Sequence, residues 1–166
     1  MEFCLRDLPA VLEEAVGGAG PETMQKAPPG KWNSTQILEH LYLSYTATNQ
    51  AIARRLNSGK PVTKAATLKQ RLAVFLITGI GYFPEGVKAP EVVVPRGVPP
   101  ELVRGTMFAE IQKMVSGLDD CERRFGPRTK IIDHPILGPL NANQCRKLHW
   151  LHARHHARQI RERTSL

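Results

Sequence analysis

The sequence predicts an all-α protein, a four-helix bundle with a short accessory helix and a long Pro-rich crossover loop. Two observations predict this class. Apolar residues recur at helical spacing in several segments, and Gly- or Pro-rich stretches separate those segments. Aromatic residues make up only 6% of the chain, so aliphatic side chains must form most of the core. With 166 residues, the chain is long enough for one domain, residues 1–166, to bury a core of its own.

Several segments carry the helical pattern, and most of them have recognisable ends. Asn33 or Ser34 is a good N-cap for the second segment, and Gly59 follows its last turn. Trp32, just before the cap, can pack the start of that helix against the core. Pro100, followed by an acid, opens the fourth segment. The helices are expected at residues 5–16, 33–56, 69–80, 100–125 and 142–163.

The segments between and around these helices differ in composition. Residues 69–80 are so continuously apolar that we expect this helix to be buried. Residues 82–100 carry five prolines, which favours a functional lid or a crossover connection with a short extended piece at 91–94. Residues 131–140 are predicted to be an apolar loop that leads to Asn141 or Asn143 as the cap of the last helix.

Charge and cysteine content narrow the class of protein. The net charge of +8 is concentrated in the C-terminal part, and such a field can attract nucleic acid, anionic lipid or an acidic small molecule. No RRM, zinc-finger or homeodomain pattern accompanies it, so a solvated basic face is favoured over nucleic-acid binding. Three cysteines without a CxxC pair indicate reduced thiols and a cytoplasmic protein. We expect no signal peptide and no membrane span, because the longest apolar stretch, residues 72–83, is too short.

Four histidines fall within eight residues of the last predicted helix: His149, His152, His155 and His156. His152 and His156 are four residues apart, so they lie on one helix face and can converge on a single ion. A third ligand must come from elsewhere. His40 is expected on the inward face of the second helix, although a lone histidine there is more often a core residue. The alternative for the last helix is a basic, partly exposed element with ordinary surface histidines.

The segments Trp32–Leu41 and His152–Ile160, together with His134–Pro139, resemble the DinB/YfiT-like family of metal-dependent enzymes. The resemblance implies a DinB-like four-helix bundle and a divalent metal ion held by His40, His152 and His156. The sequence departs from the family pattern after His152, where Ala153 replaces an acid, and after His156, where Ala157 precedes Arg158. These departures affect inherited substrate contacts more than the three metal ligands.

Three imidazole ligands leave an open position on a four-coordinate ion, as in catalytic rather than structural sites. Imidazole suits zinc, nickel and iron alike, so the metal is not distinguished. Gln159, His149 and His155 are candidates for contacts behind the ligands. Arg154 and Arg158 are candidates for binding a carboxylate of a substrate.

The resemblance implies a thiol-dependent S-transferase, or a related hydrolase or isomerase, acting on a small molecule with a thiol such as bacillithiol or mycothiol. It also implies a homodimer. Two alternatives stay open. One is a non-catalytic basic helical bundle that binds an anionic partner, and the other is a metal-binding carrier or sensor.

Overall fold

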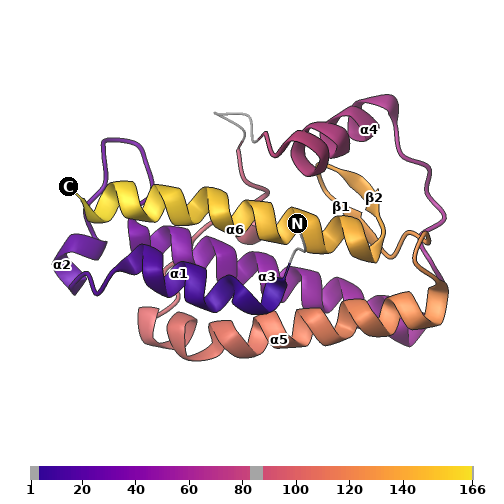
Figure 1. Cartoon of the computed structure of the whole chain (residues 1–166), viewed down its shortest axis with the longest axis horizontal. Coiled ribbons are helices and arrows are strands. Elements are labelled where there is room, and N and C mark those ends of the chain that lie inside the picture. The colour runs from indigo at the N-terminus through magenta and orange to yellow at the C-terminus, as the bar shows by residue number, and fades with distance from the viewer. Residues whose placement is uncertain (1–3, 83–87, 166) are drawn as a thin grey trace.

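A computed structural model describes residues 4–82 and 88–165, and most of them are helical. Four helices lie along one another in Figure 1: α1 (Leu8–Val16), α3 (Ser34–Ser58), α5 (Pro100–Phe125) and α6 (Ala142–Thr164). A short helix, α2 (Pro21–Met24), links α1 to α3. The predicted all-α class is confirmed.

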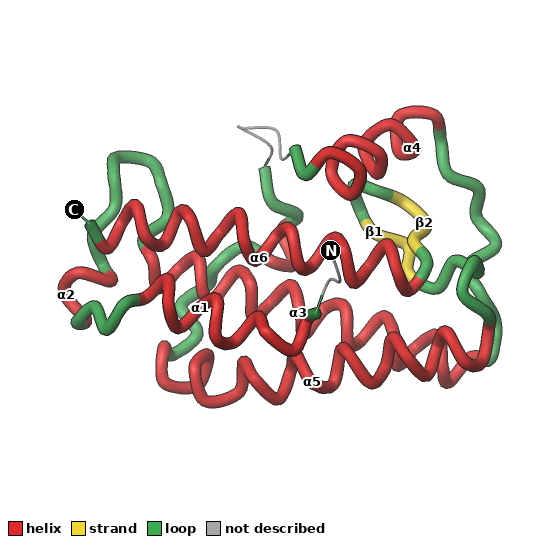
Figure 2. The backbone as a smooth tube through the Cα atoms, in the orientation of Figure 1, coloured by secondary structure: helices red, strands yellow, loops and turns green. Residues whose placement is uncertain are grey.

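Helix α4 (Leu68–Val74) and a small hairpin lie together at one end of this group (Figure 1). Helix α4 continues into a π-helical turn, Phe75–Ile80, and packs beside the hairpin of β1 (Ile132–His134) and β2 (Gly138–Leu140), as Figure 2 shows. Two 3₁₀ turns, Leu5–Asp7 and Glu91–Val93, complete the described elements. Among the described residues, no helix combines the length and the apolar character needed to cross a bilayer.

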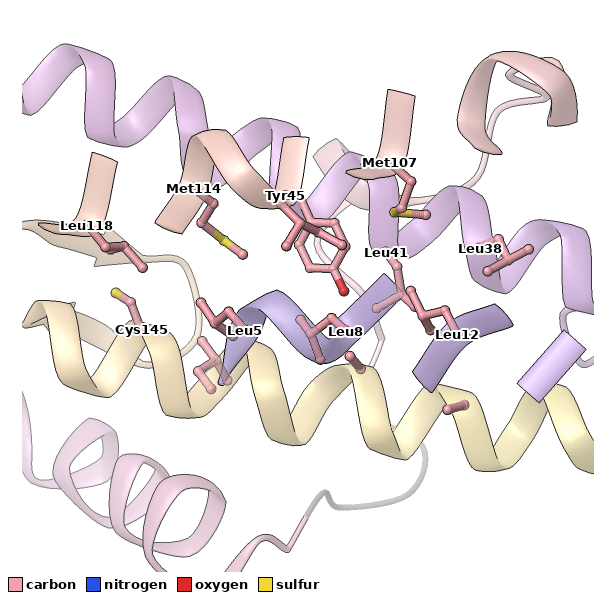
Figure 3. Packing of buried hydrophobic residues seen from close by; sticks show 14 of the residues in the cluster. Leu5, Leu8, Leu12, Leu38, Leu41, Tyr45, Met107, Met114, Leu118 and Cys145 are labelled. Carbon is pink, nitrogen blue, oxygen red and sulfur yellow. The ribbon is translucent and has the colours of Figure 1, made fainter. Parts of the chain in front are cut away.

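The hydrophobic core lies between α1, α3, α5 and α6. Figure 3 shows Leu8 and Leu12 of α1 near Leu41 and Tyr45 of α3, with Met114 of α5 in the same cluster. All five side chains are at most 4% exposed. Burial of this aliphatic cluster is the main stabilising term for the arrangement of the four helices.

The ends of α3 and α6 follow the sequence prediction. Asn33 accepts a hydrogen bond from the amide of Gln36 (2.9 Å), and the Gln36 side chain accepts one from the amide of Asn33 in return (3.0 Å). Asn141 and Gln144 form the same capping box at the start of α6. Gly59 ends α3 in the left-handed conformation, with φ of 66°. These caps fix where the histidine-bearing faces begin.

The prediction that residues 69–80 form a buried helix is wrong. Leu72, Phe75 and Ile80 are 59%, 60% and 63% exposed, and no residue of α4 is buried. Helix α1, predicted only as an accessory helix, contributes to the core together with α3, α5 and α6, so the core forms without burying residues 69–80. A continuous apolar run has no amphipathic stripe, so its sequence does not indicate which face is buried or against which element.

Two connecting segments also differ from expectation. Residues 131–140 are a hairpin rather than a loop, with Ile132 opposite Leu140 and His134 opposite Gly138. The predicted extended piece at 91–94 is a 3₁₀ turn instead. Residues 83–87 of the Pro-rich connection, and the first three residues, on which part of the signal-peptide prediction rests, lie outside the described residues.

Candidate metal centre

Three histidines from two helices meet between α3 and α6. Nε2 of His152 lies 3.2 Å from Nε2 of His40 and 3.0 Å from Nε2 of His156. One nitrogen from each ring lies within 4.8 Å of the others, so the group can hold a metal ion. His40 and His156 are 4% and 8% exposed, and His152 is partly exposed. The structure therefore brings together the three residues that the sequence singled out.

Hydrogen bonds on the outer side of two rings fix where their protons lie. Nδ1 of His40 is 2.8 Å from the carbonyl oxygen of Val93, and a carbonyl can only accept. Nδ1 of His156 is 2.8 Å from Oε1 of Gln159. Both Nδ1 atoms therefore donate, and in neutral rings both Nε2 atoms carry lone pairs that point to the same place.

This arrangement leaves a donor missing at the centre of the triad. Nε2 of His152 can supply at most one proton between the lone pairs of His40 and His156. A divalent ion would accept all three lone pairs at once. Nitrogens bound at about 2.0 Å in a tetrahedral site lie about 3.3 Å apart, close to the two separations of 3.0 and 3.2 Å.

The electrostatics keep the three imidazoles in the form that binds metal. Burial lowers the pKa of His156 to about 3, with a further contribution from His40. Burial also lowers the pKa of His40, against the opposing effect of the Val93 carbonyl, and brings the pKa of His152 well below its usual value. Neutral rings need lose no proton when they coordinate an ion near pH 7.

A buried carboxylate holds the loop that orients His40. Oε1 of Glu39 accepts hydrogen bonds from the amides of Arg96 (2.7 Å) and Val98 (3.0 Å), and Oε2 accepts one from the amide of Gly97 (3.2 Å). The same loop presents the Val93 carbonyl to His40. Glu39 is 2% exposed, so its side chain is part of the packed support of the triad rather than of a solvent-facing surface.

Comparison with known proteins gives a family for this arrangement. A family model described as a protein of unknown function, DUF1569, matches residues 7–163. The chain belongs to the DUF1569 family. No curated protein and no solved structure matches this DUF1569 protein. The match spans α1 to α6 and includes all three histidines of the triad.

Of the predicted supporting residues in the DUF1569 protein, Gln159 and His155 lie behind His156. Gln159 accepts from His156 through Oε1, and its Nε2 atom lies 3.1 Å from Nε2 of His155. The amide group thus bridges the two imidazoles. This chain of contacts orients His156 from the side opposite the triad.

His149 has a different place. Its Nε2 atom lies 3.0 Å from the hydroxyl of Thr48, and its ring packs against Tyr45. It is 6% exposed, and Nδ1 is a buried atom without a hydrogen-bond partner among the described residues. His149 therefore makes a further polar contact between α3 and α6, about one helical turn before the triad.

The two predicted substrate arginines are not brought to the triad. Arg154 and Arg158 follow His152 and His156 by two residues each, which turns them about 200° around the helix. Both are exposed; Arg154 lies over the ring of Trp150, and Arg158 pairs with Glu162. That these arginines bind a carboxylate of a substrate stays a prediction, and any such contact would lie away from the helix face that carries the triad.

Sequence reasoning missed two residues at the site. Glu39, next to His40 in the sequence, points toward the 96–98 loop that the triad depends on. Arg163, 9% exposed, donates a hydrogen bond to the carbonyl of Trp32 (3.0 Å), whose ring packs against His40. No spacing in the sequence links residues so far apart. His134 fixes the hairpin turn, because its Nδ1 accepts hydrogen bonds from the amides at 136 and 137.

The buried His149 predicts an acid-sensitive fold. Burial, aided by the charge of His134, lowers its folded pKa to about 3, whereas an unfolded histidine titrates near 6.5. Between these values the unfolded chain binds more protons, so stability is full above about pH 6.5 and falls as the pH drops. The residue contributes up to about 1.4 kcal/mol per pH unit to that slope. Urea unfolding of metal-free His149→Gln between pH 7 and 5 should show a slope shallower by that amount. Parallel slopes for the variant and wild type would contradict it.

Proposed function

We propose that this DUF1569 protein is a divalent-metal-dependent enzyme built on a DinB-like four-helix bundle, with His40, His152 and His156 as the ligands. The observation that carries the proposal is the convergence of three Nε2 atoms, two of them with lone pairs fixed by outer hydrogen bonds. A purely structural packing of histidines would have no need to orient the rings in this way.

Three protein ligands leave room for one more on a tetrahedral ion, which favours an enzyme over a structural site. When bound, such an ion would lower the pKa of a thiol or a water in that position. The residues of the chain would hold the ligand geometry: Val93 and Gln159 fix the rings of His40 and His156, and Glu39 fixes the loop that carries Val93.

For the reaction, we propose S-transfer from a low-molecular-weight thiol to a small electrophile, with a related hydrolase or isomerase reaction as the alternative. The resemblance of residues 32–41 and 152–160 to the DinB/YfiT-like family supports this class. In such a transfer the thiol loses its proton to solvent, a new S–C bond forms, and the leaving group departs with the electron pair of the bond that breaks.

The proposal is tested with glutathione as the thiol and monochlorobimane as the electrophile, which releases chloride and gives a fluorescent conjugate. Protein loaded with zinc, nickel or ferrous ion should accelerate conjugation over the metal-free protein, and His40→Ala should not. A rate equal to that of the metal-free protein, with a further panel of thiols and electrophiles also unchanged, would overturn the enzyme assignment. Tight metal binding in that case would indicate a carrier or sensor.

A further inference from the structure

A second polar site lies between the α4 end of the molecule and the first turns of α6. A cavity of about 450 Å³ opens there, between the π-helical turn, the hairpin and α6. Lys147 lies five residues before His152, which places it about 140° around the helix from that ligand. The cavity therefore belongs to another face of α6 than the triad.

The walls of this cavity are cationic on one part and apolar on another. Arg71, Lys130 and Lys147 line it together with Val74, Phe75 and Pro139. No carboxylate is found among the described residues of the lining. Asn143 and Gln144, in the first turn of α6, add the positive end of that helix.

Of the three cations, Lys130 gives the strongest evidence that the cavity binds an anion. Its ammonium is half-buried and donates to Oε1 of Gln144 (2.6 Å), a neutral amide. Among the described residues, no carboxylate lies within 4.0 Å of Lys130 or Arg71, although other basic residues of the chain do form ion pairs. Burial lowers the pKa of Lys130, as expected for an ammonium removed from water, against a smaller opposing effect of Cys145. An anion in the cavity would stabilise the charged ammonium.

Packing of α4 against the hairpin fixes the walls of the cavity. Gln70 of α4 packs against Gly138 of β2 so closely that a Cβ atom at Gly138 would lie 2.6 Å from its side chain. This contact holds α4 against the hairpin that carries Pro139. The π-helical turn supplies Phe75, and such turns occur frequently at functional sites.

We propose that this cavity binds a small organic anion, a carboxylate or phosphate joined to an apolar body, with the head group at Arg71, Lys130 and Lys147 and the apolar part along Val74 and Phe75. The site is independent of the metal. Lys130 is half-buried without a carboxylate within 4.0 Å among the described residues, exposed Arg71 adds positive charge to the same cavity, and the apolar wall favours a ligand with an apolar part.

Calorimetric titration of chelator-treated protein with hexanoate, hexyl phosphate and hexan-1-ol tests the proposal. Hexanoate or hexyl phosphate should bind, and hexan-1-ol should bind at least about tenfold more weakly because it lacks the charge. Arg71→Met/Lys130→Met should reduce the affinity for the bound anion at least about tenfold. The control Lys69→Met/Lys113→Met removes the same net charge from exposed positions outside the cavity and should bind as wild type does.

A footprint on the wild type covers the case in which the double variant fails to fold. Reductive methylation, read by mass spectrometry, should slow at Lys130 and Lys147 in the presence of the bound anion and stay unchanged at Lys69 and Lys113. Absence of binding by both anions, equal binding of the alcohol, equal loss in both double variants, or uniform protection of all four lysines would overturn the proposal. None of these results bears on the metal site, because the protein is metal-free throughout.

Discussion

Replacing His156 with alanine is expected to abolish stoichiometric binding of a divalent metal ion. The variant removes one of three converging nitrogens and leaves two, His40 and His152, on different helices. Loss of a mere outer partner of a metal ligand already weakens binding 10- to 100-fold, so loss of the ligand itself should weaken it more than about 100-fold. Titration calorimetry of the untagged, metal-free protein with zinc and nickel measures this directly.

The matched control for this variant is His149→Ala. His149 lies on the same helix, is similarly buried at 6% against 8% exposed, and loses the same side-chain atoms. Its nitrogen faces Thr48 rather than the triad, so its variant should bind the metal within a few-fold of wild type. Equal loss in both variants would mean that general disruption of α6, and not ligand removal, explains the effect.

Replacing Glu39 with alanine is expected to weaken both the fold and the metal site. The variant leaves three backbone amides, at residues 96, 97 and 98, without their acceptor. Hydrogen bonds to a charged acceptor contribute about 1.5–3 kcal/mol each, and partial exposure of the loop to water will recover part of it, so we expect a loss of about 2–4 kcal/mol. Urea unfolding of the metal-free protein measures this loss.

The effect of Glu39→Ala on metal affinity shows whether Glu39 positions His40 in addition to stabilising the fold. When the 96–98 loop is released, Val93 no longer holds Nδ1 of His40, and metal affinity should fall about tenfold. Glu39→Gln, which retains one acceptor oxygen, should give intermediate values. The control Glu110→Ala removes a carboxylate that accepts from Asn49 (2.7 Å) on another part of α3. It should lower stability without changing the metal affinity, and a shift in affinity equal to that of Glu39→Ala would contradict the positioning role.

The sequence was sufficient where the physical determinants are local. Asn33 and Asn141 cap the helices that they were expected to cap, because a capping box depends on residues three apart. The four-residue spacing of His152 and His156 fixes their common face by helix geometry alone. The same reasoning placed His40 on the inner face of its helix, where it lies.

The sequence was insufficient where tertiary partners decide. Leu72 and Phe75 are apolar yet exposed, since α1 covers the core and α4 packs on the hairpin instead. Glu39 and Arg163 support the triad through contacts with residues 57 and 131 positions away, and no periodicity encodes such contacts. Arg154 and Arg158 lie on the same helix as His152 and His156, but on its exposed side.

The central claim is that three imidazoles of this chain hold one divalent ion. Elemental analysis of the protein, purified without a polyhistidine tag, tests it most directly when wild type is compared with His40→Ala/His152→Ala/His156→Ala. We predict close to one zinc, nickel or iron per wild-type chain and none above background in the triple variant, with folding of both checked by circular dichroism. Equal metal content in both proteins, or none in wild type even after incubation with these ions, would contradict the claim.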